Sequence, residues 1–301
     1  MNETPNMSES VVEVVGLSKR FRRKAALSDV SLQIERGVVF GLVGENGAGK
    51  TTLIRHLLGL FQAQQGSIAV FGHDPVCEPV AVLGRIGYLS ESREMPEWMR
   101  VGELMAYTQG FYPNWDAGFA DELCEMFELA KDQRIKSLSR GQRARAGLLV
   151  ALAHRPELLI LDEPSSGLDP IVRRDILAAI IRTVADEGRT VLFSSHLLDE
   201  VERAADEVAM LHQGRLVLSD SLEQILDSHH LLTVRFDQPQ PARPQLDGAL
   251  GWSGEGEEWT CVVNGELQRL QDQVASAGAA IVDQRRPTLE DVFVARASRP
   301  E

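Results

Sequence analysis

The sequence predicts an α/β protein with a substantially parallel sheet, followed by a small α+β appendage. Short runs rich in β-branched residues alternate with helical stretches up to about residue 219. Residues 158–162 form a fully apolar run, which is typical of a buried parallel strand. The pattern changes near residue 226, and the proline-rich segment 237–244 is not expected to continue a sheet.

The expected elements follow from residue type and spacing. Helices are expected where apolar residues recur at helical spacing, as in 50–60, and strands where β-branched and other apolar residues gather. The expected strands are 11–17, 30–34, 38–43, 67–71, 158–162 and 190–194, with 208–211 and 216–218 as a hairpin around Gly214. The expected helices are 50–60, 141–152, 171–187 and 197–205, and 101–129 is expected to be mostly helical. The appendage is expected to have strands at 231–236, 259–263 and 279–282 and helices near 266–277 and 288–297.

The composition indicates a globular protein outside the membrane. The 301 residues include 31 Lys and Arg against 44 Asp and Glu, which gives a net charge of −13. Such an acidic chain is a poor candidate for wide contact with nucleic acid, because phosphate contacts need Lys and Arg. No apolar run approaches the ~18 residues that cross a bilayer, and residues 1–10 do not resemble a signal peptide. Cys77, Cys124 and Cys261 are expected to be small packed side chains of a cytosolic protein.

Residues 44–51 match the phosphate-binding pattern G-x-x-x-x-G-K-[ST], between an expected strand and an expected helix. The glycines let backbone N–H groups point inward around a phosphate chain, and the helix adds the positive end of its dipole. Lys50 is expected to hold the β- and γ-phosphates, and Thr51 to complete a Mg²⁺ shell. The residues expected to bind nucleotide here are Gly44, Asn46, Gly47, Ala48, Gly49, Lys50, Thr51 and Thr52.

Two carboxylates, Asp162 and Glu163, end the apolar strand. Ligands of parallel sheets bind at the carboxyl ends of the strands, so we expect both side chains near the phosphate loop. Asp162 is predicted to bind Mg²⁺ directly or through water, and Glu163 to act as the base or orienter of an attacking water. An acidic strand end alone is more often a solvated surface; the phosphate loop is what favours the functional interpretation.

Three further motifs follow in order. Residues 138–142 read Leu-Ser-Arg-Gly-Gln, residues 166–169 read Ser-Gly-Leu-Asp, and His196 follows Phe-Ser-Ser. With the two phosphate motifs, they resemble the signature sequence, D-loop and switch histidine of ATP-binding cassette (ABC) ATPases, over residues 11–225. The resemblance implies a P-loop NTPase with a RecA-like core, an antiparallel β subdomain and a helical subdomain at about 92–140. Residues 226–301 would form an accessory α+β domain.

In that family two cassettes face each other head to tail and enclose two ATP molecules. The resemblance implies that Asp169 links the two sites and that His196 holds the γ-phosphate and the water. His196 would then be catalytic together with Lys50 and Glu163; the alternative is that it only caps the helix at 197. The implied cofactors are ATP and Mg²⁺. The residues that would meet the ATP of the opposite cassette are Ser139, Gly141 and Gln142.

Phe21 stands where the family has an aromatic ring that stacks on adenine, although it could simply pack in its strand. Its basic neighbours, which include Lys19 and Lys24, form either a solvated loop or a stretch near the nucleotide phosphates. Two residues depart from the family pattern. Glu91 replaces a glutamine that contacts Mg²⁺; it can accept a hydrogen bond from a metal-bound water but cannot donate one, and we keep it as a metal residue. Arg140 replaces the commoner glycine of the signature and is interpreted as tolerated.

The leading hypothesis is the cytosolic ATPase subunit of a bacterial ABC transporter, most similar to multidrug and peptide-antibiotic exporters. The resemblance implies a second cassette, identical or paralogous, and a separate transmembrane permease that holds the chain at the inner face of the cell membrane. Aromatic residues such as Trp98, Tyr107 and Phe111 are either core or exposed for a helix of that permease. The alternative is an ABC ATPase that acts on nucleic acid or ribosomes, but such relatives usually carry two cassettes or long coiled-coil insertions. A GTPase or a kinase lacks support, because no [NT]-K-x-D motif occurs.

Overall fold

The structure, a computed structural model, describes residues 10–22, 24–174, 176–178, 188–240 and 246–297. The chain divides into two compact units, Met1–Leu216 and Val217–Glu301, which are described separately. No helix in these described ranges is both long enough and apolar enough to span a membrane.

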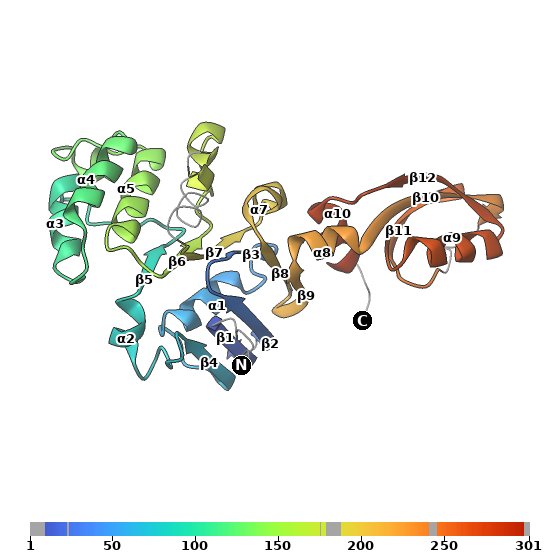
Figure 1. Cartoon of the computed structure of the whole chain (residues 1–301), viewed down its shortest axis with the longest axis horizontal. Helices are drawn as coiled ribbons and strands as arrows, with labels where there is room; N and C mark the ends of the chain where they lie inside the picture. The colour runs from blue at the N-terminus through green and yellow to red at the C-terminus, as the bar shows by residue number, and fades with distance from the viewer. Residues whose placement is uncertain (1–9, 23, 175, 179–187, 241–245, 298–301) are drawn as a thin grey trace, which may run out of the picture. The chain divides into compact units, whose positions relative to one another are not determined.

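The first unit holds two sheets and a group of helices (Figure 1). Its strands are β1 (Ser10–Phe21), β2 (Lys24–Glu35), β3 (Val39–Val43), β4 (Gln65–Val70), β5 (Ile86–Leu89), β6 (Leu158–Asp162), β7 (Thr190–Ser195), β8 (Glu207–His212) and β9 (Arg215–Ser221), which crosses the boundary between the units. Its helices include α1 (Lys50–Leu57), α2 (Pro79–Leu83), α3 (Val101–Gln109), α4 (Ala117–Met126), the 3₁₀ turn η1 (Ile135–Ser137), α5 (Arg140–Leu152) and α7 (Leu198–Ala204).

The central sheet has six strands in the order β5-β6-β7-β3-β8-β9. The pairs β5–β6, β6–β7, β3–β7 and β3–β8 are parallel, which confirms the predicted parallel sheet. In the register, Val43 pairs with Ser195 and Asp162 with Ser194, so β3, β6 and β7 end level with one another. The loops that follow these three strands therefore leave the sheet at one edge.

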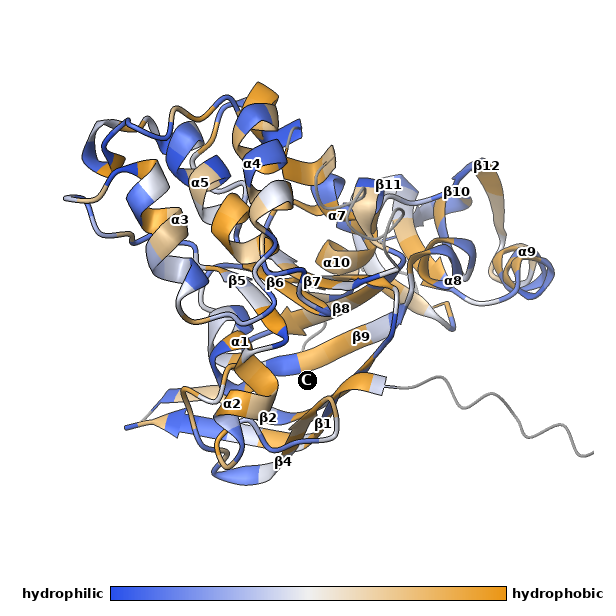
Figure 2. Ribbon diagram, turned by 60° about the vertical axis from the view of Figure 1, so that its left-hand side comes forward, coloured by the Kyte–Doolittle hydropathy of each residue, from blue (hydrophilic) through white to orange (hydrophobic). Residues whose placement is uncertain are grey.

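A second, antiparallel sheet has the order β2-β1-β4. A large core lies between this sheet, α1 and the central sheet, and it includes Leu17, Phe40, Leu57 and Ile160, all with at most 1% of their surface exposed. Burying such a side chain stabilises the fold by about 1.5–3 kcal/mol. Figure 2 colours much of the central strands as hydrophobic, as expected for strands covered on both faces. The helices α3, α4 and α5 lie together, and α5 also packs against β5 (Figure 1).

The second unit is an α+β fold. It contains α8 (Leu222–Asp227), β10 (His229–Gln240), β11 (Ala249–Asn264), α9 (Leu267–Ser276), β12 (Ala279–Arg285) and α10 (Leu289–Ala297). Its antiparallel sheet has the order β11-β10-β12. Two small cores, one with Leu232 and Leu270 and one with Phe236 and Val274, attach α9 to this sheet.

One expectation about the second unit is wrong. The strand β10 continues into the proline-rich segment as far as Gln240, beyond Pro239. The sheet tolerates this proline because the pairing of β10 with β11 is irregular between Arg235 and Gln240, so a missing N–H breaks no regular ladder. Residues 241–245 of the segment lie outside the described residues. The strand expected at 259–263 is also much longer, since β11 begins at Ala249.

Other differences concern short elements. The stretch 101–129 contains two helices, α3 and α4, and the elements α2, β5 and α8 were not expected. The strand β5 has only four residues and contains Gly87, which weakens its sequence signal. Glycine is needed there because a Cβ at position 87 would lie 2.1 Å from the Ala151 carbonyl oxygen. The helix expected at 171–187 lies partly outside the described residues.

Glu157 lies just before β6, and its contribution to the stability of the fold can be tested. Its carboxylate accepts hydrogen bonds from Arg85 at 2.5 and 2.9 Å and from Arg36 at 3.0 Å. The bonds from Arg85 are the main cause that lowers the pKa of Glu157 from its ordinary 4.5 to about 2. Unfolded chains thus bind a proton near pH 4.5 that the native protein does not bind until about pH 2. The stabilisation is complete above pH 4.5 and is lost as the pH falls towards 2.

We therefore predict that Glu157→Gln lowers the free energy of unfolding at pH 7 by about 1 kcal/mol, a value kept small because the side chain is 38% exposed. The difference from the unsubstituted chain should shrink at pH 4. Urea unfolding at the two pH values measures both effects. A difference that grows on acidification would show that the arginine pairs do not stabilise the fold.

Candidate nucleotide-binding site

The phosphate loop, residues 44–49, joins β3 to α1, and its glycines are required by close packing. A Cβ at Gly44 would lie 2.3 Å from the Leu211 carbonyl oxygen, and one at Gly49 would lie 2.6 Å from the Ala26 carbonyl oxygen. Gly49 also has φ +115°, which L side chains rarely adopt. Ala48 is buried, and its N–H donates to the Glu45 carbonyl at 3.0 Å. The loop is therefore a tight turn that ends at the positive end of α1.

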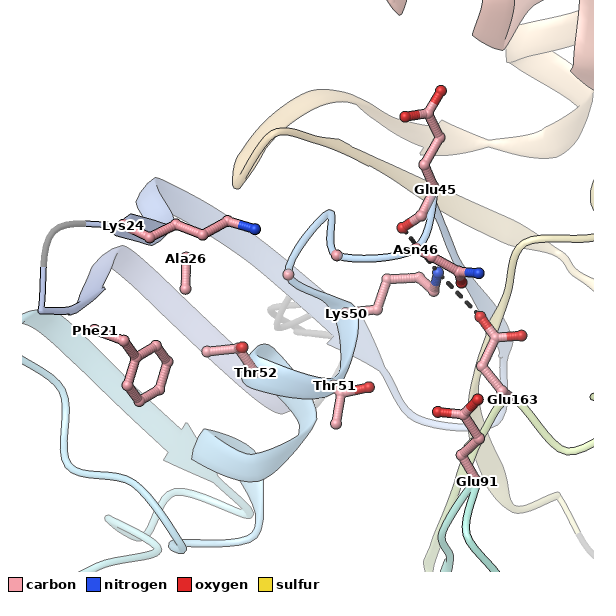
Figure 3. A pocket seen from close by; sticks show the side chains of 12 residues that line it. Phe21, Lys24, Ala26, Glu45, Asn46, Lys50, Thr51, Thr52, Glu91 and Glu163 are labelled. Carbon is pink, nitrogen blue, oxygen red and sulfur yellow. Dashed lines mark hydrogen bonds and ion pairs between the residues drawn. The ribbon is translucent and has the colours of Figure 1, made fainter.

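A pocket of about 420 Å³ lies beside this loop (Figure 3). The predicted residues that line it are Phe21, Asn46, Gly47, Gly49, Lys50, Thr51, Thr52, Glu91 and Glu163. Lys24, Ala26 and Glu45 also line it; Lys24 belongs to the basic run around Phe21, Glu45 lies within the phosphate-loop motif, and Ala26 had no sequence signal. Gly44 and Ala48 do not line the pocket but shape the loop that does.

Lys50 lines this pocket and contacts both the phosphate loop and Glu163. Its ammonium nitrogen donates to the Gly44 carbonyl at 2.5 Å and to the Glu45 carbonyl at 3.4 Å. It also lies 3.0 Å from Glu163 Oε1, and both side chains are almost fully buried, with 6% and 5% exposed. Figure 3 shows the lysine reaching across the loop towards Glu163. A buried cation thus sits against the turn that the sequence predicts to enclose phosphates.

Asp162 lies beside Thr51. The Thr51 hydroxyl donates to Asp162 Oδ1 at 3.3 Å, and the Ser194 hydroxyl donates to the same oxygen at 2.8 Å. The Glu163 N–H in turn donates to Ser194 Oγ at 2.9 Å. Ser194 was missed by the sequence analysis although it lies in the Phe-Ser-Ser-His motif; its position opposite Asp162 in the sheet is what brings it here.

Glu163 and His196 meet directly. His196 Nδ1 lies 2.6 Å from Glu163 Oε2, and because a carboxylate only accepts, the hydrogen of this bond is on Nδ1. Glu163 has φ +49°, a left-handed backbone that is uncommon outside glycine and that the surrounding contacts maintain. Lys50 contacts one carboxylate oxygen and His196 the other, so both oxygens of the predicted base are held in place.

Phe21 lies on the opposite side of the pocket from the two carboxylates Glu91 and Glu163 (Figure 3). Its ring is 43% exposed and packs edge-on against Phe61, with centroids 5.4 Å apart. Lys19 Nζ lies 5.7 Å from the same ring. The ring therefore packs within its unit and also borders the pocket. Its role in stacking on adenine stays a prediction.

Thr51, Asp162 and Glu91 are the residues that could hold a metal ion. They offer a hydroxyl and carboxylate oxygens, which are the ligands that Mg²⁺ prefers. The 3.3 Å contact between Thr51 and Asp162 shows that two of these oxygens already converge. In the described part of the chain, no group of three or more His, Cys, Asp and Glu side chains could form a metal site by itself. A bound Mg²⁺ would therefore need phosphate oxygens and water as further ligands.

The signature and D-loop residues lie outside this pocket. Ser139 caps α5: its hydroxyl accepts from the Gln142 N–H at 3.1 Å, and the Gln142 side chain accepts from the Ser139 N–H at 3.0 Å. Gly141 packs so closely on Val172 that a Cβ would lie 2.9 Å from the valine Cγ2. Asp169 accepts from two backbone N–H groups at 3.0 and 3.1 Å. Within one chain the structure thus does not bring these residues to Lys50.

The phosphate loop, the buried Lys50–Glu163 pair and the parallel sheet define a P-loop ATPase cassette. Comparisons with known proteins identify the same class of protein. The sequence matches the ABC transporter family over residues 27–166. It is 36% identical to a daunorubicin resistance ATP-binding protein, DrrA3, of Streptomyces coeruleorubidus, with 96% of both chains covered.

Solved structures show the same fold. An ATP-binding subunit of an ABC transporter matches with a TM-score of 0.66 and 28% identity, covering 72% of this chain and 92% of that chain. A dimeric bacterial ABC transporter cassette matches with a TM-score of 0.64 and 20% identity, covering 70% of this chain and 98% of that chain. The chain therefore belongs to the ABC transporter family: it is an ATP-binding subunit and an ATPase.

Lys50→Ala tests the phosphate-binding pocket. We predict that it weakens the binding of a fluorescent ATP analogue at least about tenfold, because it removes a charge-assisted contact of about 1.5–3 kcal/mol. Lys131→Ala is the matched control, since Lys131 pairs with the exposed Asp121 at 2.7 Å outside the pocket. Fluorescence titration measures both variants. Equal ATP affinities for Lys50→Ala and Lys131→Ala would exclude Lys50 as a phosphate-binding residue.

Proposed function

We propose that this chain is the ATP-hydrolysing subunit of a membrane exporter of drugs, peptides or lipid-like compounds. The observation that carries the proposal is the similarity to the daunorubicin resistance protein, which extends over 96% of both chains. It thus includes the appendage as well as the cassette. In this assignment residues 11–225 form the nucleotide-binding domain and residues 226–301 an accessory domain.

The proposed reaction is attack of water on the γ-phosphorus of ATP, with cleavage of its bond to the β–γ bridging oxygen and release of ADP and phosphate. Glu163 orients the water and takes its proton, and its contacts with Lys50 and His196 support this role. Lys50 and the backbone of the phosphate loop bind the charged oxygens. Bound Mg²⁺, held by Thr51 and Asp162 with Glu91 nearby, would neutralise charge on the β- and γ-phosphates.

The proposed working unit is a pair of cassettes. Ser139, Gly141 and Asp169 lie away from Lys50 in one chain, so a second cassette would supply them to each site. This agrees with the dimeric form of the solved cassette. Ser139 lies at the start of α5, where the helix directs free backbone N–H groups and its positive end outward.

A permease is the proposed membrane partner, and it would place the chain at the inner face of the cell membrane. Exposed aromatic residues of the helical region support a docking surface for the permease on that region. Trp98, Tyr107 and Phe111 are 69%, 53% and 65% exposed. The rings of Tyr107 and Phe111 lie 5.1 Å apart on α3 and the turn after it. Exposed apolar groups that cluster in this way commonly mark a contact with another protein.

Glu163→Gln tests the mechanism. We predict that it lowers ATP turnover at least about 100-fold, the usual size of a general-base effect. ATP should still bind, and a stable ATP-dependent dimer should accumulate in light scattering coupled to gel filtration. Glu157→Gln, at the other end of β6, is the control and should keep its turnover. Turnover by Glu163→Gln near the unsubstituted rate would exclude Glu163 as the base.

Inverted membrane vesicles test the direction of transport. Vesicles that hold this chain and its permease should accumulate daunorubicin when ATP is added outside, because the cytoplasmic face is outermost. Vesicles with Glu163→Gln should not. ATP-driven loss of preloaded daunorubicin would indicate import. Absence of movement for daunorubicin and for a panel of amphiphilic peptides and lipids would reject the proposed substrate class.

A further inference from the structure

The segment 164–169 contains the D-loop residues and joins them to the predicted base, and its own backbone hydrogen bonds give it little support. Its own backbone hydrogen bonds are local turns: the Ser166 N–H donates to the Glu163 carbonyl at 3.1 Å, and the Leu168 N–H donates to the Ser165 carbonyl at 3.1 Å. Such turns do not fix the position of a segment relative to the rest of the protein. Side chains from other elements must do so.

Arg93 makes the principal contact of this kind. One guanidinium nitrogen, Nη2, donates to the Pro164 carbonyl at 2.8 Å and to the Ser166 carbonyl at 2.9 Å. Only 9% of the residue is exposed. It belongs to the loop after β5, where its N–H donates to the Ser90 carbonyl at 3.1 Å and its φ is +49°. A buried side chain thus holds the first turn after Glu163 at two points.

The charges around Arg93 fit a fixed contact. The carboxylate of Glu91 and the cation of Arg140 both interact electrostatically with Arg93. The guanidinium stays charged in proteins, so its bonds to the two carbonyls are charge-assisted and stronger than neutral ones. The contact therefore attaches the loop of Glu91 to the segment that follows the base.

Glu200 makes a second contact with the segment. The Ser165 hydroxyl donates to Glu200 Oε2 at 2.5 Å, and the Ser195 hydroxyl lies 3.5 Å from the same oxygen. Glu200 is on α7, the helix that follows His196. The segment is thus held between the loop of Glu91 and the helix behind the predicted switch histidine.

We propose that Arg93 is a positioning residue for ATP hydrolysis: its two hydrogen bonds hold the turn at Pro164–Ser166 so that the Glu163 carboxylate stays aligned for water attack. The inference rests on the proposed role of Glu163. Arg93 lines a neighbouring cavity of about 730 Å³ and not the pocket of Lys50. Its loss should therefore reduce the rate of the chemical step and leave nucleotide affinity unchanged.

The test uses the full chain with Arg93→Met, which keeps an apolar stem and removes the donors, and Arg93→Lys, which keeps a donor. The control is Arg85→Met, because Arg85 is a half-buried arginine just before β5 that also makes two hydrogen bonds, to Glu157 outside the site. We expect kcat to fall at least about tenfold in Arg93→Met, which is about 1.4 kcal/mol in activation free energy, while KM stays within about twofold. Arg93→Lys should recover at least a third of the rate, and Arg85→Met should lower Tm and keep kcat.

Three results would overturn the proposal. The first is a normal kcat in Arg93→Met, and the second is equal loss in Arg93→Lys. The third is a variant that does not fold, or whose kcat, KM and Tm change together by more than in Arg85→Met, since the arginine would then be structural. Glu163→Gln measured alongside separates this from failure of the proposed function, because an active Glu163→Gln rejects the base whatever Arg93 does.

Discussion

The level ends of the parallel strands β3, β7 and β6 are the constraint on which the site depends. Asp162 at the end of β6 pairs with Ser194 in β7, and β3 pairs with β7 on the other side. Parallel strands run in one direction, so the loops after them leave at one edge of the sheet. Lys50, Glu163 and His196 follow three different strands, and Glu163 contacts both of the others because those strands end together. A shift of one residue in this register would separate the lysine from the carboxylate.

The buried pair of Lys50 and Glu163 has consequences for both stability and chemistry. A charge that is buried without a partner is costly, so each of these groups stabilises the other. The second oxygen of Glu163 is held by His196. The carboxylate is therefore fixed at both oxygens and lies next to Lys50 at the phosphate loop. A variant at either position changes the free energy of unfolding as well as the rate of ATP hydrolysis. The two quantities therefore need separate measurements.

The chain carries its chemical groups on two distinct surfaces. The pocket of Lys50 is lined by the phosphate loop, Glu91 and Glu163, whereas Ser139 and Asp169 cap helices or turns outside it. The short segment after Glu163 connects these surfaces, and Arg93 and Glu200 each hold it through hydrogen bonds. Such a connection can relate the position of the helical region to the alignment of the base, because the loop of Arg93 leads into that region.

The sequence alone determined the phosphate loop, the carboxylates of the apolar strand, the signature and the order of most elements. These features are local: a run of glycines before a helix, or an apolar strand that ends in acids, carries its geometry within a few residues. Short or irregular elements were not predicted from the sequence. The strand β5 depends on the packing of Gly87 against α5, and the end of β10 depends on an irregular ladder around Pro239. Only the tertiary structure decided that Ser194 bonds Asp162 and that Arg93 holds the turn after Glu163. The physical reason is that distances between loops depend on strand register and on the packing of distant segments, which no local pattern of residues specifies.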